Sequence, residues 1–332
     1  MQKTVLVIFS LLFFASAFRP QQFEEGKSLW SAWKVTHNKL YSNGEDAARF
    51  AIFMENYKYI LKFNAESTSV KLGLNKMADL TKEEFKQKYL GFAFEEQDPK
   101  VIKANTIQLP RFGDLPQTVN WTDQGAVGPV KDQAQCGSCW AFATVGALES
   151  YHFLQYGGDM LSFSEQQVID CNRDPNMGCK GGFPYTVFQY SSTYGLQLES
   201  DYPYLEYQQS TCYYQKSKAY QINMGYSFVE SNSKDMLKNA LAITPTVVAV
   251  EADQTIFQLY KSGVISYGCG AEIDHAVLAV GFGIVDGTEA FIVKNSWGTS
   301  WGINGYFYLS TDPSLNEGAG ACGILTQPVF PF

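Results

Sequence analysis

Polar and apolar residues recur with a helical period through residues 22–91, and this stretch predicts an all-helical first unit. Trp30, Trp33 and His37 fall at helical spacing in its first segment. Asn43-Gly44 predicts a break after that segment. The acidic residues Glu45-Asp46, which follow directly, favour the first turn of a second helix.

The second predicted helix carries a mixed stripe along one side. Its members are spaced three or four residues apart: Glu45, Arg49, Phe53, Asn56, Ile60 and Asn64. At about 100° per residue they cover a face roughly 100° wide. Charged and amide groups on such a face need specific partners wherever they are buried. Thr81 and Glu84 then have the spacing of a capping box, which predicts a third helix ending near Gly91.

Three later apolar segments each place one chemically distinct side chain at an end. Cys139 stands where a polar loop meets the apolar run Trp140–Phe153, which predicts a helix beginning at this cysteine. His275 heads an apolar strand, and Asn295 follows another. Free backbone N–H groups and the positive end of the helix dipole favour a thiolate at Cys139.

A short apolar run opens the chain. Lys3 gives a positive start, Val5–Phe14 is almost wholly apolar, and Ala15-Ser16-Ala17 offers small residues for cleavage. A membrane span needs about 20 residues, so residues 1–17 are predicted to be a secretory signal peptide rather than a membrane helix. No later segment approaches a span, and we expect no membrane association once the signal is removed.

Composition narrows the class of protein. The 332 residues are 45% hydrophobic and 15% aromatic, which is enough for two or three compact units. The formal net charge is −8 and no basic run occurs, so a nucleic-acid partner is disfavoured.

The chain has seven cysteines, all beyond residue 130: Cys136, Cys139, Cys171, Cys179, Cys212, Cys269 and Cys322. In an oxidising compartment an odd number predicts three disulfides and one free thiol. Two other uses are weaker. A redox pair of Cys136 and Cys139 lacks a preceding strand of thioredoxin type, and a zinc site would need Cys171 and Cys179, whose spacing is wide for ligands.

His275 is the residue that can serve Cys139 as a base. Of the three histidines, one belongs to the first helical unit, and His152 lies about 20 Å along the central helix from Cys139 at 1.5 Å per residue. An imidazole that exchanges protons needs its far nitrogen held in one tautomer, and the amide oxygen of Asn295 suits that role. Trp297 would then cover the pair from water.

Together these features resemble the cathepsin L-like members of the papain family of cysteine peptidases. The mixed stripe matches the pattern of the family's inhibitory prosegment, and Gly73–Asp79 resembles its second motif, with Met77 where an aromatic is usual. An independent helical module is the alternative interpretation. From Trp121 to the C-terminus the family motifs are spread over the whole length. The resemblance implies an α+β fold with a helical lobe and a β-barrel-like lobe, preceded by an all-helical prodomain.

The resemblance also divides the chain. It implies a signal peptide at 1–17, an inhibitory propeptide at 18–114 and a peptidase domain at 115–332. Residues 92–114 lose periodicity and contain two prolines. They are expected to run backwards through the active-site cleft and to be cut on activation.

Roles for single residues follow from the same resemblance. Cys139, His275 and Asn295 are the expected catalytic residues, and Gln133 with the backbone N–H of Cys139 matches the oxyanion donors. Ala134 stands where the family usually has glycine, so its β-carbon strains the loop if φ is positive there. The implied disulfides are Cys136–Cys179, Cys171–Cys212 and Cys269–Cys322.

Substrate contacts are expected along one cleft, with Trp297 beside the catalytic pair. Gly181 and Gly182 leave room for a peptide backbone to pair in an extended manner. The pocket for the side chain two residues before the cut matches six positions: Phe183, Pro184, Ala249, Ile273, Ala276 and Gln327. Such a pocket predicts a preference for bulky apolar or aromatic side chains and no strong acceptance of arginine.

The sequence therefore predicts a cysteine endopeptidase, made as a zymogen in the secretory pathway and destined for a lysosome-like acidic vacuole or the extracellular space. Its expected partners are protein or peptide substrates and its own propeptide, and we expect a monomer without metal or organic cofactor. A catalytically inactive papain-like binding protein and a prosegment-type peptidase inhibitor are the alternatives. Asn120 opens the sequon Asn120-Trp121-Thr122 and is a candidate for glycosylation.

Overall fold

The computed structural model describes residues 20–92, 105–106 and 115–332. The predicted signal peptide and most of the predicted linker lie outside the described residues. Within the described ranges, no helix is long and apolar enough to cross a membrane.

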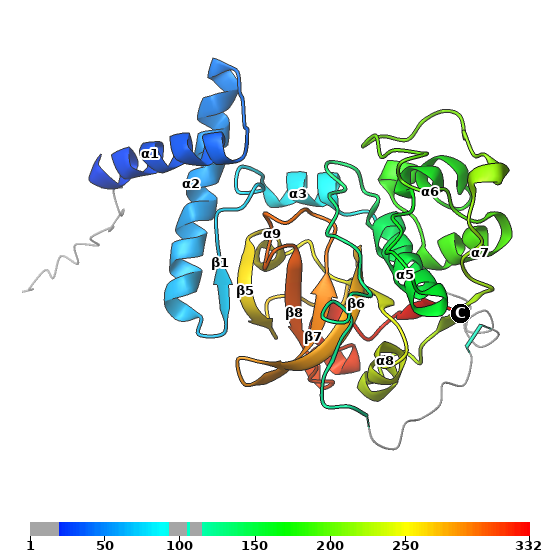
Figure 1. Ribbon diagram of the computed structural model, residues 1–332. Coiled ribbons are helices and arrows are strands. Elements are labelled where there is room, and N and C mark those ends of the chain that lie inside the picture. The colour runs from blue at the N-terminus through cyan, green and yellow to red at the C-terminus, as the bar shows by residue number, and fades with distance from the viewer. Residues whose placement is uncertain (1–19, 93–104, 107–114) are drawn as a thin grey trace, which may run out of the picture.

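The first unit consists of three helices and one short strand (Figure 1). Their bounds are α1 Pro20–Thr36, α2 Asn43–Glu66, β1 Val70–Leu72 and α3 Lys82–Tyr89. The predicted break between the first two helices is present, but it lies at residues 37–42 rather than at Asn43-Gly44, because Ser42 is the N-cap and both of those residues lie in the first turn of α2. The first N–H groups of a helix have no intrahelical partner, so asparagine and glycine are tolerated there. β1 was not predicted; it pairs antiparallel with β5 (Tyr260–Ile265) of the second unit.

The mixed stripe on α2 binds the segment that follows it in sequence. Its apolar members, Phe53 and Ile60, are buried. Asn56 donates hydrogen bonds of 2.8 and 3.0 Å to two carbonyl oxygens in the loop before α3. Asn64 donates to and accepts from the backbone of Leu72, both at 2.9 Å. The polar members therefore have the specific partners that their burial requires.

Glu84 connects α3 to α2. Its carboxylate accepts hydrogen bonds from the backbone N–H of Thr81 at 3.0 Å and from Arg49 at 2.7 Å. Its own backbone N–H donates to the Thr81 hydroxyl, which completes the predicted capping box. The hydrogen bond from Arg49 lowers the pKa of the Glu84 carboxyl below its usual value.

We expect Glu84→Ala to destabilise the first unit by about 1–2 kcal/mol at pH 7, because it removes half of the cap and the partner of Arg49. A carboxyl whose pKa is depressed on folding contributes stability above its unfolded pKa and loses it as the pH falls through the folded pKa. The deficit should therefore be smaller at pH 4. Thermal unfolding of the unprocessed chain at pH 7 and pH 4 measures the loss of stability. Glu83→Ala, at an exposed position of the same helix, is the control. Equal losses for the two substitutions would contradict the role of Glu84 as cap and partner of Arg49.

The second unit contains one sheet and five α-helices in the described residues (Figure 1). The helices are α5 Cys139–Tyr156, α6 Glu165–Cys171, α7 Pro184–Tyr194, α8 Lys234–Leu241 and α9 Thr255–Gln258. The strands besides β5 are β2 Val119–Asn120, β3 Tyr226–Phe228, β4 Thr246–Val250, β6 His275–Val285, β7 Thr288–Lys294, β8 Tyr306–Ser310 and β9 Val329–Pro331. The strand order is β1-β5-β8-β7-β6-β4-β9-β3, with β2 on β6. Strands pair antiparallel except β5 with β8.

α5 is the helix predicted to begin at Cys139. Its first 12 residues are all buried, because α7 packs on one side of it and β6 on the other. Gly146 allows the Leu278 side chain of β6 to approach closely. The helix ends three residues later than predicted, at Tyr156, where Gly157 has φ of 66°. The fold therefore fixes Cys139 at the boundary between the helical lobe and the sheet lobe.

Three disulfides join the cysteines in the pairs that the family resemblance implies: Cys136–Cys179, Cys171–Cys212 and Cys269–Cys322. Cys139 is the free cysteine. The redox-pair and zinc-site alternatives are therefore wrong, because Cys136, Cys171 and Cys179 are all bonded to other partners.

Candidate active site

Cys139 occupies the first turn of α5, and its side chain is fully buried. Its sulfur accepts a hydrogen bond of 3.5 Å from the backbone N–H of Ala276, the second residue of β6. The preceding loop is held by the Cys136–Cys179 disulfide and by a hydrogen bond of 2.9 Å from Gly137 N–H to the carbonyl of Cys179. The sulfur of the helical lobe thus lies directly against the strand that His275 begins.

His275 and Asn295 come together because β6 and β7 are antiparallel neighbours. Nε2 of His275 lies 2.8 Å from Oδ1 of Asn295, as an imidazole held by an amide oxygen requires. Trp297 stacks on the imidazole with 4.6 Å between ring centroids and is fully buried. Within the described residues, Nδ1 of His275 has no hydrogen-bond partner. That nitrogen is therefore available for proton exchange.

In the unprocessed chain, burial is the largest influence on the pKa values of Cys139 and His275. Burial raises the pKa of the Cys139 thiol to about 12 and lowers the pKa of His275 to about 4. The sequence-based expectation was a thiol whose pKa is lowered by the helix start. The opposite direction arises because the first unit covers the sulfur and excludes water, which penalises both charged forms.

Gln133 is buried beside the site and binds the first unit. Its Nε2 donates to the carbonyl of Tyr89 in α3 at 2.9 Å and to the carbonyl of Cys136 at 2.8 Å. Its Oε1 accepts from Ser296 at 2.6 Å, which fixes the direction of the amide. Ala134 has φ of 52°, so the loop does adopt the left-handed conformation that favours glycine.

The chain just after α3 crosses between the two lobes as an extended segment. Gly182 N–H donates to the carbonyl of Gly91 at 3.0 Å, and Phe92 N–H donates to the carbonyl of Asp274 at 3.0 Å. Phe92 forms a parallel bridge with Gly182. A β-carbon on Gly181 would lie 2.6 Å from the Gly91 carbonyl oxygen, so this glycine is needed for the close approach. A β-carbon on Gly182 would instead meet the Trp140 indole at 2.6 Å.

An apolar pocket surrounds Phe92. Its other lining residues are Phe183, Pro184, Tyr185, Phe228, Gln327 and Val329. Three of the six predicted pocket residues belong to this lining. Ala249 and Ala276 are buried opposite each other in β4 and β6, and Ile273 is buried just before His275, but none of the three lines it. Sequence reasoning missed Tyr185, Phe228 and Val329; their apolar character marks them as buried without indicating which cavity they face.

Comparison with known families gives two matches. Residues 115–332 match the model of the papain family cysteine protease, and residues 30–85 match the cathepsin propeptide inhibitor domain I29. The chain belongs to the papain family of cysteine proteases. It is accordingly a cysteine peptidase with an I29 propeptide domain ahead of it.

Individual relatives agree with this membership. The chain is 40% identical to the probable cysteine protease RD21B of Arabidopsis thaliana over 93% of its own length and 67% of that protein. It is 39% identical to chymopapain of Carica papaya, covering 92% and 86% of the two chains. Among solved structures, digestive procathepsin L 3 of Tenebrio molitor larval midgut superposes with a TM-score of 0.81 at 34% identity, covering 92% and 98%. The papain-like fold predicted from the sequence is confirmed.

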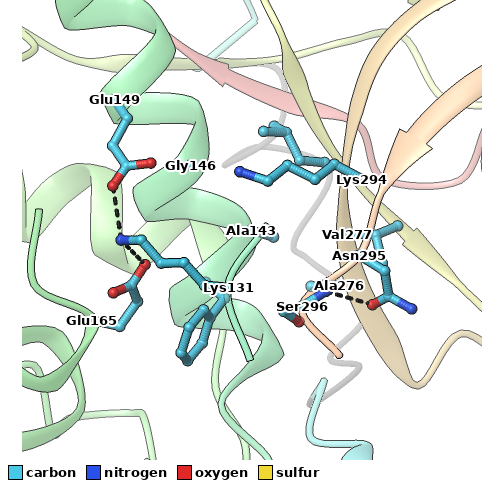
Figure 2. Close-up of a pocket in the computed structure, with 12 residues that line it drawn as sticks. Lys131, Ala143, Gly146, Glu149, Glu165, Ala276, Val277, Lys294, Asn295 and Ser296 are labelled. Carbon is cyan, nitrogen blue, oxygen red and sulfur yellow. Dashed lines mark hydrogen bonds and ion pairs between the residues drawn. The ribbon is translucent and has the colours of Figure 1, made fainter. Parts of the chain in front are cut away.

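Beside Asn295 and Ser296 of this papain-family protease lies a buried cluster of charged side chains that sequence reasoning missed (Figure 2). Lys131 forms ion pairs of 2.8 Å with Glu149 and Glu165 of the helical lobe. Lys294 is also buried and donates to the carbonyl of Gly128 at 2.9 Å. Because Lys131 lies two residues before Gln133, and Lys294 directly precedes Asn295, the cluster anchors both backbone segments that position the site.

Proposed function

We propose that the chain is an endopeptidase whose nucleophile is Cys139. The observation that carries the proposal is the hydrogen bond of 2.8 Å between His275 Nε2 and Asn295 Oδ1, beside a cysteine at a helix start. When the first unit leaves, water reaches the site and burial no longer opposes charge separation. The thiol then passes its proton to Nδ1 of His275, and the helix start stabilises the thiolate.

The proposed reaction has two halves. The Cys139 thiolate attacks the substrate carbonyl carbon, and the oxyanion accepts hydrogen bonds from Gln133 Nε2 and the Cys139 backbone N–H. His275 protonates the leaving amine, which leaves a thioester on Cys139. Water, deprotonated by His275, hydrolyses the thioester and restores the thiol. Asn295 holds the imidazole in one orientation throughout.

We propose further that the peptidase domain is 115–332 and that residues 18–114 inhibit it until they are removed. Three contacts support this. The Tyr89 carbonyl takes the donor that we assign to the oxyanion. Gly91 packs against Gly137, two residues before Cys139, and its carbonyl oxygen accepts a hydrogen bond of 3.0 Å from Gly182 N–H. The bridge of Phe92 with Gly182 is parallel, and we propose that a substrate runs the opposite way.

The pocket around Phe92 is the proposed site for the side chain two residues before the cut. Its lining is apolar or aromatic apart from Gln327, which has no charge to attract a cation. On paired peptide substrates we expect phenylalanine or leucine at that position to exceed arginine at least about tenfold in kcat/KM. Gln327→Glu should raise the value for arginine, while Gln327→Leu should not. Preference of the unaltered enzyme for arginine would contradict this assignment.

Cleavage of peptides by the processed chain, compared with its Cys139→Ala variant, tests the proposed activity. We expect hydrolysis that requires Cys139. A chain that never cleaves, even after the first unit is removed, would instead favour the inactive binding protein. Inhibition of other peptidases by the unprocessed chain would favour the inhibitor interpretation.

The remaining proposals concern the protein's localisation, its oligomeric state and its glycosylation. We propose secretory targeting to an acidic vacuole or the cell exterior, a monomer, and glycosylation at Asn120. The Asn120 amide is partly exposed and donates to Asp123 at 2.7 Å, a surface contact that a glycan could replace. A mass decrease on treatment with a peptide-N-glycosidase, absent in Asn120→Gln, would support the glycan; no decrease would contradict it.

A further inference from the structure

The first unit contacts the peptidase domain through three ion pairs within the described residues, and in each the first unit supplies the cation. Lys76 binds Asp132 at 2.5 Å. Lys86 binds Asp253 at 2.8 Å, and Lys82 lies 4.0 Å from the same carboxylate. Lys82 also donates to the Gln254 side-chain oxygen at 3.1 Å. We use the name α3 docking surface for four residues of the peptidase domain: Asp132, Asp253, Gln254 and Trp297. Asp132 binds Lys76 in the loop before α3, and the other three contact α3 itself.

Trp297 supplies the apolar centre of this surface. Phe85 and Tyr89 of α3 meet its indole edge-on, with ring centroids 5.3 and 6.2 Å away. α3 also packs against α9, beside the sheet lobe (Figure 1). A basic helix with an apolar face is therefore already bound here, by aromatic contacts at the centre and ion pairs at the rim.

The negative charge extends past the residues that touch α3. Glu272 and Asp274 raise the pKa of Lys86 together with Asp253. Burial raises the pKa of the Asp274 carboxyl itself to about 7, so its negative charge is complete only above that pH. Asp274 keeps one buried oxygen without a hydrogen-bond partner in the described residues. Residues 115–332 hold 9 lysines and arginines against 20 aspartates and glutamates. When α3 leaves, this surface loses its bound cations, and no described lysine or arginine of the peptidase domain forms an ion pair with its carboxylates.

The position of the surface along the cleft identifies its occupant. Phe92 lines the pocket that we assign to the side chain two residues before the cut, and the Tyr89 carbonyl lies at Gln133 beside the nucleophile. α3 precedes Phe92 in the chain and packs against α9 of the sheet lobe, whereas the pocket is lined by residues at the start of α7, on the other side of α5 (Figure 1). A substrate that replaces this segment must therefore place the residues after the cut over Trp297 and Asp253.

We propose that the α3 docking surface binds the first residues on the carboxyl side of the scissile bond and favours lysine or arginine among them. The inference rests on the proposed endopeptidase function and names part of its substrate class. Attraction between exposed charges weakens with ionic strength, so the preference should fall as salt is added. Asp253 is the dominant carboxylate, because it holds two lysines of the first unit.

The test uses the processed enzyme and internally quenched peptides that are identical before the cut. They carry lysine, glutamine or glutamate at the second and third positions after it. We expect kcat/KM to be about five- to tenfold higher for lysine than for glutamate at low salt. Asp253→Asn should reduce that ratio by more than half, while the glutamine peptide is cleaved as before. Asp286→Asn, at an exposed turn between β6 and β7, is the matched control and should leave the ratio unchanged.

The outcomes separate the two proposals. Equal cleavage of the three peptides, or a lysine preference that survives Asp253→Asn unchanged, overturns the assignment of this surface while the peptidase proposal stands. Failure to cleave any of the peptides overturns the proposed function and this inference with it.

Discussion

Replacement of His275 by alanine lowers kcat/KM of the processed enzyme for peptide hydrolysis by about 10³-fold or more. The imidazole is required twice in the proposed reaction, to take the proton of Cys139 and to give it to the leaving amine. His275 lies beside Cys139, because the backbone N–H of the next residue, Ala276, donates a hydrogen bond of 3.5 Å to the Cys139 sulfur. Steady-state kinetics on one fluorogenic peptide measure the loss.

His152→Ala is the matched control, because it removes the same side chain elsewhere on the scaffold. His152 lies near the far end of α5 and contacts Tyr156 with ring centroids 4.8 Å apart. We expect its removal to leave kcat/KM within about threefold of the unaltered enzyme. Comparable losses for the two variants, or an active His275→Ala enzyme, would contradict the assignment of the base.

Replacement of Gly91 by alanine releases the inhibition of the unprocessed chain. A β-carbon at this position would lie 2.0 Å from the carbonyl oxygen of Gly137, far inside contact distance. The carbonyl cannot move aside easily, because Gly137 is hydrogen-bonded to Cys179 and its neighbour Cys136 is disulfide-bonded to the same residue. The extended segment must therefore lift away from Cys139. We expect the rate of self-processing at acid pH to rise at least about tenfold.

Gly44→Ala controls for a substitution in the first unit that meets no obstacle. An added β-carbon there has no atom within 4 Å, and Gly44 lies in the first turn of α2. Its processing rate should match that of the unaltered chain, followed by the appearance of the shorter product on gels. Gly91→Ala chains that process no faster would show that close passage of this segment over the nucleophile is not what inhibits the enzyme.

The three residues that we propose as catalytic could be singled out from the sequence, because each stands at the end of an apolar segment whose type is evident from its pattern. Cys139 begins a buried helix, and His275 and Asn295 flank neighbouring strands. The polar members of the α2 stripe were also predictable as a group that needs partners. The identity of those partners was not, because the Asn64 amide binds a strand, β1, that is only three residues long.

The full lining of the pocket and the raised pKa of the Cys139 thiol could not be predicted, because both depend on packing between segments far apart in the sequence. Phe228 reaches the pocket through the pairing of β3 with β9, more than 100 residues apart in sequence. The pKa of Cys139 is raised because separate parts of the chain cover it, an effect that outweighs the helix start. The break between α1 and α2 was placed a few residues too late for a local reason, since turn-forming residues such as Asn43 and Gly44 also suit the first turn of a helix.

Modification of Cys139 by a thiol-directed peptidyl epoxide, mapped by mass spectrometry of the intact and digested protein, tests the proposed nucleophile and its inhibition by the first unit. The experiment compares the unprocessed chain with the processed enzyme at the same pH. We expect one label per molecule, on Cys139, in the processed enzyme and almost none in the unprocessed chain, where the sulfur is buried and its pKa is raised to about 12. Equal labelling of both forms, or a label on any other residue, would contradict this expectation.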